Sequence, residues 1–134
     1  MKTVQIAKWR IEADPEATQD HYLSAGPPCG CLYCRNFRKA FSGFPWFEEL
    51  GVTPALPDLL SDFPAETPDK RLYIGHYQLA GRLLDGPEVM DGHWNESVTA
   101  AIGDFTIGFS RAEDGLMLEF EAVLPWWMDE SQED

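Results

Sequence analysis

Three cysteines fall within six residues, in the segment Cys29-Gly30-Cys31-Leu32-Tyr33-Cys34. Thiolates and imidazoles are the usual ligands of zinc, which takes four of them in a tetrahedral arrangement. Cys31 and Cys34 have the spacing of a zinc knuckle, and Cys29 adds a third sulfur. His21 is the histidine nearest in sequence. The cluster therefore predicts a zinc site formed by Cys29, Cys31 and Cys34, with His21 as the candidate fourth ligand.

Two other interpretations of the cluster stay open. A Cys-x-x-Cys pair at the start of a helix is typical of thiol-redox proteins of the thioredoxin kind, because the helix dipole and nearby cations favour thiolates. Cys31-x-x-Cys34 is followed by Arg35 and Arg38, but a Gly26-Pro27-Pro28 loop precedes it where that motif would have a strand. Alternatively the three thiols are structural, since free cysteine packs as a small hydrophobic side chain.

The cluster opens a segment with helical periodicity. Aromatic residues recur on one helical face, at Tyr33, Phe37, Phe41 and Phe44. The sequence around Pro45 interrupts this pattern. We therefore predict a helix, a kink and a second short helix that carries the apolar residues Trp46, Phe47 and Leu50 and ends at Gly51.

The remaining patterns are those of strands and loops. We expect a strand over 3–11 with a bulge near Ala7, a loop over 12–28, a proline-rich connection over 51–70 and a strand over 71–84. Alternating runs at 105–109 and 116–124, separated by a turn that ends in Asp-Gly, predict a β-hairpin. One face of this hairpin is apolar and the other carries Glu119 and Glu121.

These elements predict an α+β fold: an antiparallel sheet of about four strands, covered on one face by a kinked, aromatic-rich helical segment. A chain of 134 residues is the size of one domain. We place that domain at residues 1–128 and an acidic C-terminal tail at 129–134.

The formal charge of −13, from 23 acids and 10 bases, argues against nucleic acid or an anionic membrane as a partner. Residues 83–134 account for −12 of this charge, with Arg111 as their single base. An alternative function is therefore an acidic interaction module, of the immunity or inhibitor type, that binds a basic protein partner. Its candidate contact residues are Glu119, Glu121, Trp126 and Trp127.

Motifs of common enzyme classes are absent from the sequence, among them G-x-S-x-G, G-x-G-x-x-G, Walker A and H-E-x-x-H. No apolar stretch has the length of a membrane span, and the first residues lack the apolar run of a secretory signal. Three cysteines without such a signal suggest a reducing compartment. We therefore predict a small, non-enzymatic cytoplasmic protein whose candidate cofactor is zinc.

The segment from Cys29 to Phe37 resembles a Cys-x-Cys-x-x-Cys-x-Asn-aromatic motif found in a family of small acidic bacterial proteins of unknown function. The run from Tyr73 to Gly81 and the ending Leu118-Glu119-Phe120…Leu124-Pro125-Trp126 are similar to the same family, so the resemblance covers about residues 28–127. It implies a bacterial cytoplasmic protein and brings no activity with it. It also makes Asn36 a residue to test together with the cysteines.

Overall fold

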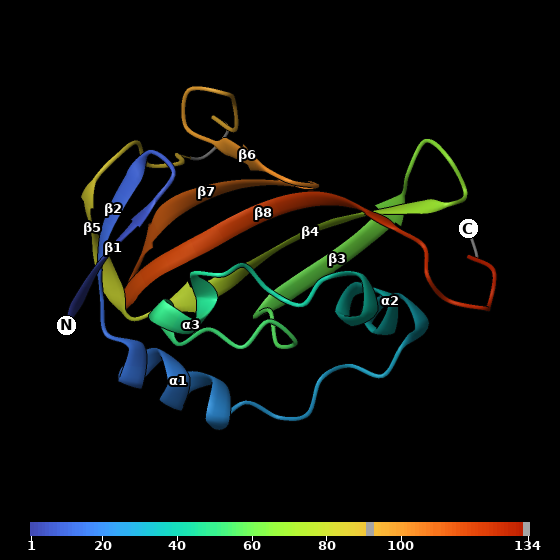
Figure 1. The fold of residues 1–134 in the computed structure, drawn as a ribbon, viewed down its shortest axis with the longest axis horizontal. Helices are drawn as coiled ribbons and strands as arrows, with labels where there is room; N and C mark the ends of the chain where they lie inside the picture. The colour runs from blue at the N-terminus through green and yellow to red at the C-terminus, as the bar shows by residue number, and fades with distance from the viewer. Residues whose placement is uncertain (91–92, 133–134) are drawn as a thin grey trace.

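The computed structural model describes residues 1–90 and 93–132, which form eight strands and three short helices (Figure 1). In chain order the elements are β1 (Lys2–Ile6), β2 (Trp9–Ala13), α1 (Pro15–Leu23), α2 (Leu32–Ala40), α3 (Phe47–Leu50), β3 (Leu59–Pro64), β4 (Lys70–Leu79), β5 (Gly81–Asp85), β6 (Ala100–Ile102), β7 (Phe105–Ala112) and β8 (Gly115–Pro125). The fold is α+β, as the sequence predicts.

The strands form two antiparallel sheets instead of one sheet of about four strands. The larger sheet has the order β3-β4-β8-β7-β6, and the smaller one has the order β1-β2-β5. The chain passes from the larger sheet to the smaller one between β4 and β5, inside the stretch predicted as one strand. Gly81 permits this change, because a Cβ there would lie 2.4 Å from the carbonyl oxygen of Glu12 in the neighbouring β2.

The N-terminal region differs from both predictions made for it. The expected bulge near Ala7 is a hairpin turn between β1 and β2, in which Ala7 has a left-handed φ of 49°. The expected loop over 12–28 contains α1. Asp14 caps this helix by accepting the N–H of Ala17 at 3.1 Å, and Pro15 occupies its first turn. Both are ordinary helix-start residues, so the signal was present in the sequence.

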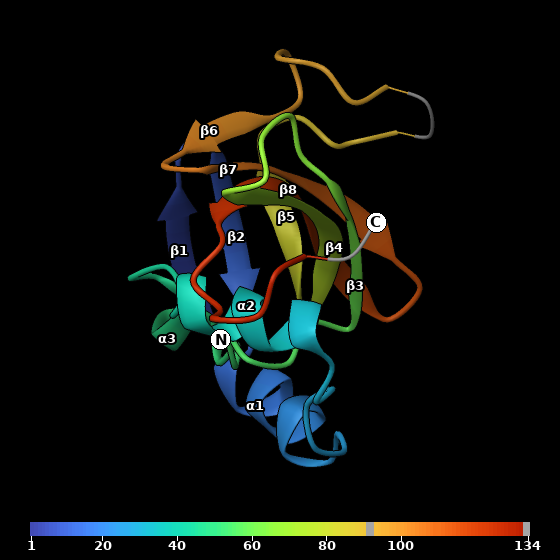
Figure 2. The same cartoon turned by 90° about the vertical axis from the view of Figure 1, so that its right-hand side faces the viewer.

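The helix, kink and second helix predicted after Cys31 are confirmed as α2, residues 41–46 and α3. Gly51 ends α3 with a left-handed φ of 79°. In Figure 2 this segment lies on one side of the larger sheet. Its buried aromatic side chains belong to the same core as the inward-facing residues of that sheet. The ring of Phe37 lies 5.3 Å from that of Tyr73 and 5.8 Å from that of Phe120. This aromatic contact holds α2, and therefore the cysteine cluster, against the sheet.

The predicted hairpin between the alternating runs is confirmed as β7 and β8, paired from Phe105–Ala122 to Ala112–Gly115. Every second residue of β8 points inward and is buried: Leu116, Leu118, Phe120, Ala122 and Leu124. Glu119 and Glu121 alternate with them and are half-buried on the outer face.

The described part of the predicted acidic tail, 129–132, lies against the loop before β4. Gln132 donates from Nε2 to the carbonyl oxygens of Pro68 at 2.7 Å and Lys70 at 2.9 Å. The last two residues of that predicted tail lie outside the described residues. Across the described residues, no helix has the length and apolar character needed to cross a bilayer.

Candidate metal centre

The cysteine cluster forms the entry to α2. Cys31 is the N-cap residue, and its Sγ accepts a hydrogen bond from the N–H of Cys34 at 3.4 Å. The Sγ of Cys29 accepts the N–H of Cys31 at 3.5 Å. The first N–H groups of a helix have no partner within the helix and form its positive end. The sulfurs therefore lie where local backbone dipoles favour negative charge, as the sequence predicts.

The three sulfur atoms form a compact triad. The Sγ atoms of Cys29, Cys31 and Cys34 lie within 4.8 Å of one another, and all three residues are free thiols. Tetrahedral zinc with Zn–S bonds of about 2.3 Å requires sulfurs about 3.8 Å apart. The triad is therefore close enough to hold one metal ion with only a small contraction. Cys29 and Cys31 are exposed and Cys34 is half-buried, so an ion can reach the site from solvent.

Two arginines of α2 hold the loop that carries the cysteines. Arg38 donates from Nη1 to the carbonyl oxygen of Cys29 at 2.7 Å, and Arg35 donates from Nε to that of Gly30 at 3.1 Å. These bonds fix the backbone of the loop on the helix. Arg38 also places a positive charge beside Cys29, where it offsets the charge of a thiolate, whereas the guanidinium of Arg35 pairs with Glu130 at 3.6 Å.

The environment separates the pKa values of two of the thiols. The pKa of Cys29 is lowered, chiefly by the hydrogen bond from the Cys31 N–H, then by the thiols of Cys31 and Cys34. Burial raises the pKa of Cys34 to about 12, with hydrogen bonds to Cys31 and Cys29 acting in the same direction. Without metal, Cys34 is therefore a neutral thiol at pH 7, and a metal ion that binds there displaces its proton.

His21, the candidate fourth ligand, lies in the last turn of α1 with Nε2 against Oδ1 of Asp58. The other oxygen of Asp58 accepts the hydroxyl of Tyr22 and the N–H of Gln78, both at 2.8 Å. This carboxylate joins α1 to the neighbouring ends of β3 and β4. Burial, followed by the bond to Asp58, raises the pKa of Tyr22. Within the described ranges, His21 is not part of the group formed by the sulfur atoms.

A cavity of about 440 Å³ adjoins the triad. Cys29, Cys34 and Arg38 contribute to its lining, together with Leu56 and Asp58 from the segment that leads into β3. Its volume falls in the range of small-molecule sites, which is about 300–1,000 Å³. The sequence did not indicate this cavity, because its walls come from segments that are distant in the chain.

Asn36, singled out by its place in the cysteine motif, is fully buried and joins α2 to two strands. Its Nδ2 donates to the hydroxyl of Tyr73 at 3.2 Å and to the carbonyl of Pro125 at 3.1 Å. Its Oδ1 accepts the N–H of Trp127 at 2.8 Å. The side chain thereby positions the helix that carries the cysteines and contacts no cysteine sulfur through these bonds.

The residues predicted to bind a partner lie on two surfaces. Glu119 and Glu121 are on the outer face of β8, whereas α2 covers the inner face. Trp126 packs on Tyr33, with ring centroids 5.6 Å apart, and Trp127 is 52% exposed next to α2. The structure therefore does not bring the glutamates and the tryptophans together into one site.

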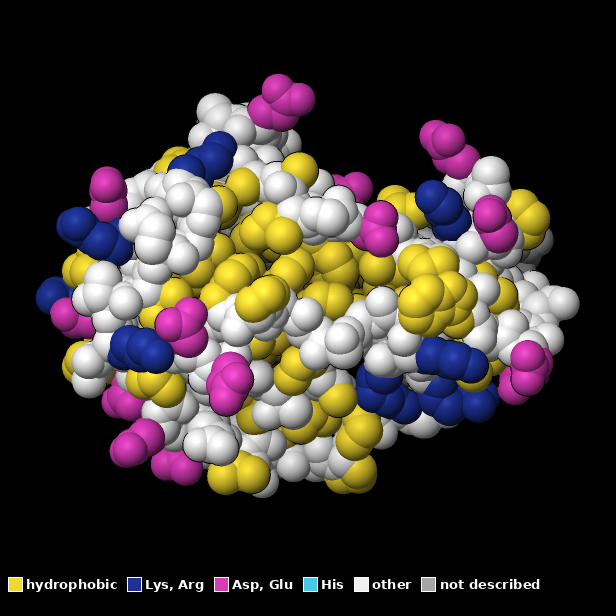
Figure 3. All heavy atoms as spheres, viewed as in Figure 1, with side chains coloured by type: hydrophobic (Ala, Val, Ile, Leu, Met, Phe, Trp, Pro, Cys, Tyr) yellow, Lys and Arg dark blue, Asp and Glu magenta, His cyan; other side chains and the backbone are white. Residues whose placement is uncertain are grey.

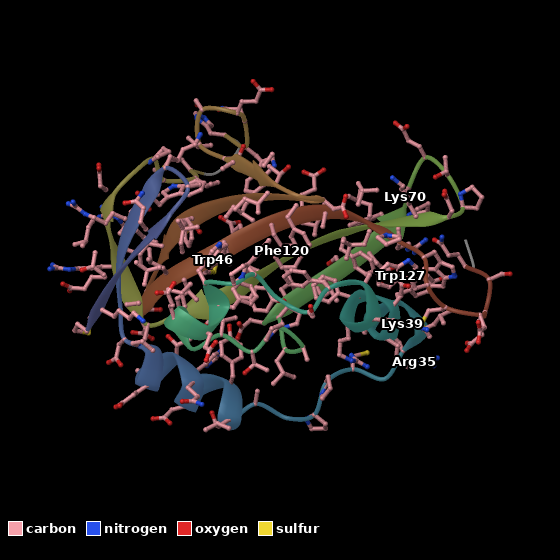
Figure 4. The ribbon with its side chains drawn as sticks, viewed as in Figure 1. Arg35, Lys39, Trp46, Lys70, Phe120 and Trp127 are labelled. Carbon is pink, nitrogen blue, oxygen red and sulfur yellow. The ribbon has the colours of Figure 1, made fainter. Side chains whose placement is uncertain are left out.

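Trp127 lies between Lys70 and Lys39 in Figure 4, with Arg35 beyond Lys39. In Figure 3 several positive side chains lie at this end of the molecule with acidic side chains around them, and further positive side chains lie at the opposite end. The sequence indicated that Arg35 and Arg38 follow the cysteines closely. It did not indicate that Lys70, at the start of β4, lies near α2.

Comparisons of the chain with protein-family models, with curated proteins and with solved structures found no match. The resemblance to small acidic bacterial proteins therefore stays a prediction.

Proposed function

We propose that the protein binds one zinc ion through the thiolates of Cys29, Cys31 and Cys34, in a structural and non-enzymatic role. The observation that carries this proposal is the separation of the three sulfur atoms, all within 4.8 Å of one another. Zinc is well suited to such a set because it accepts sulfur ligands in a tetrahedral arrangement and has no redox chemistry of its own. The charge of Arg38 would offset the negative charge that three thiolates leave on a divalent ion.

The structural role follows from which segments the ligands join. Cys29 belongs to the connection between α1 and α2, which contains no helix or strand, whereas Cys31 is the N-cap of α2 and Cys34 lies in its first turn. A bound ion would tie this connection to the helix. The free energy of metal binding would then stabilise the folded arrangement of the connection.

Metal content tests this proposal. Protein purified without a tag and without chelator is expected to contain about one zinc per chain by elemental analysis. Its three thiols should react slowly with a thiol reagent until a chelator is added. Protein without metal whose three thiols react at once would overturn the proposal. Slowly reacting thiols without metal would also overturn it, and would support purely structural cysteines.

As a second candidate we propose an acidic interaction module, favoured by the surroundings of the two glutamates. Ile74 lies opposite Glu121 in the register of β4 and β8 and is 41% exposed. Ile74, Trp94, Glu119 and Glu121 line one shallow cavity of about 180 Å³. Apolar side chains bordered by carboxylates suit a basic protein that buries an apolar group, with opposite charges speeding association.

Capture from a cell extract tests this second candidate. The wild-type protein is expected to retain a basic protein at low salt and release it as salt rises, because surface charges are screened. The double variant Glu119→Gln/Glu121→Gln should retain none. Glu113→Gln/Asp114→Asn, which removes two charges from the exposed turn between β7 and β8, is the matched control. Equal capture by both variants would contradict the assignment to the outer face of β8.

A further inference from the structure

The triad supplies one ligand fewer than a tetrahedral metal ion takes. In the part of the chain that the structure describes, no fourth cysteine, histidine or carboxylate joins the three sulfur atoms. The nearest histidine in sequence, His21, is engaged with Asp58. A metal held by three protein ligands keeps its remaining position for water or for a ligand from solution.

The cavity beside the triad provides room for such a ligand. Cys29 and Cys34 belong both to the triad and to the lining of the cavity, so a molecule in the cavity lies next to two of the sulfur ligands. Part of the remaining lining is apolar, with Phe37, Leu56 and Leu60. Apolar walls with a few polar groups are typical of sites that bind small organic molecules.

The cavity lining has one cation, Arg38, and one carboxylate, Asp58, and of the two Arg38 has hydrogen-bonding groups left for a ligand. Both oxygens of Asp58 are already used by His21, Tyr22 and Gln78. Arg38 uses Nη1 for the carbonyl of Cys29, and its guanidinium carries further N–H donors. The planar guanidinium matches the shape of a carboxylate and binds it through charge-assisted hydrogen bonds.

We propose that this cavity binds a small thiol that carries a carboxylate. The thiolate would complete the coordination of the metal, and the carboxylate would bind Arg38. In this exchange the thiol releases its proton to solvent, a water molecule leaves the metal, and no electron is transferred. The inference rests on the proposed metal site, and it gives that site a ligand from solution.

Cobalt(II) is the metal for the test, because its visible absorption changes with its ligands and their geometry. Cobalt-loaded protein is titrated with 3-mercaptopropionate, with cysteamine, which has an ammonium group in place of the carboxylate, and with propionate, which has no thiol. We expect 3-mercaptopropionate to change the spectrum saturably, cysteamine to bind about tenfold more weakly and propionate to have no effect.

Two variants of α2 assign the carboxylate contact. Arg38→Gln is expected to weaken the binding of 3-mercaptopropionate about tenfold, to the level of cysteamine. Lys39→Gln removes the same charge from an exposed neighbour that does not line the cavity, and should leave the affinity unchanged. The cobalt content of each variant is measured first, so that a loss of metal is not mistaken for a loss of thiol binding.

The outcomes separate the two proposals. Failure of the wild-type protein to bind cobalt or zinc would overturn the metal site itself. Three outcomes would overturn the ligand inference without affecting the proposed metal site. They are cobalt binding without a response to 3-mercaptopropionate, an equal response to cysteamine, and removal of cobalt by the thiol. An equal loss in Arg38→Gln and Lys39→Gln would overturn the role of Arg38.

Discussion

Replacing Cys31 by serine is expected to weaken zinc binding about 100-fold or more and to leave the metal-free protein at least as stable as the wild type. Structural zinc sites bind with about 10–16 kcal/mol, so the loss of one thiolate among their ligands removes roughly 3 kcal/mol. Serine nevertheless keeps the N-cap bond that the Sγ of Cys31 makes to the N–H of Cys34, and serine is among the preferred N-cap residues. The substitution is therefore expected to weaken zinc binding without lowering the stability of the metal-free protein. Competition with a chromophoric chelator measures the first, and urea unfolding in the presence of chelator measures the second.

Cys29→Ser is the matched variant for this experiment. Cys29 is exposed and precedes the helix, so its replacement removes a sulfur ligand and leaves the N-cap of α2 in place. Its zinc affinity should fall by about the same factor as that of Cys31→Ser. Wild-type affinity in either variant would contradict a site made of three thiolates. A loss of stability in both variants with chelator present would indicate that the sulfurs serve the fold itself.

Replacing Asn36 by alanine is expected to lower the free energy of unfolding by about 3 kcal/mol. The side chain is fully buried, and the variant leaves the carbonyl of Pro125 and the N–H of Trp127 without their partner. A buried polar group that loses its hydrogen bond costs about 1–3 kcal/mol. Urea unfolding with chelator present measures the change as a lower midpoint at an unchanged slope.

Asn95→Ala is the control for this second result. Asn95 is exposed, and its Oδ1 accepts the N–H and the hydroxyl of Ser97, two residues away. We expect its stability to stay within about 1 kcal/mol of the wild type, because such groups are hydrated in the unfolded and the folded chain alike. Equal effects of the two substitutions would show that burial of the Asn36 network does not stabilise the protein.

The parts of the fold that the sequence predicts depend on local periodicity. Phe37 and Phe41 repeat at helical spacing and mark α2, and the alternation around Phe120 marks β8. The run over 71–84 also alternates, and alternation continues through the change of sheet at Ala80, so periodicity alone could not show that this stretch serves two sheets. The missed helix α1 is different, because Asp14 and Pro15 are helix-start residues that local reasoning could have used.

In the candidate site, too, the features that the sequence predicts are local in the chain. The triad is predictable because Cys29, Cys31 and Cys34 are neighbours in the chain, and a helix start brings their sulfurs together. The partners of His21 and of Asn36 were not predictable, since Asp58 and Trp127 are 37 and 91 residues away from them. Contacts between residues so far apart in the sequence depend on how the sheets and helices pack.

The pairing of β2 with β5 affects how the protein is made. Ile11 lies opposite Leu83, and the ring of Trp9 packs 5.0 Å from that of Phe109, a hundred residues later. A ribosome adds about 5–20 residues per second, so the N-terminal hairpin leaves it several seconds before either partner exists. During that interval Trp9, fully buried in the finished protein, remains without Phe109 to cover it. The smaller sheet, and the part of the core that it covers, can therefore form only after much of the remaining chain has been synthesised.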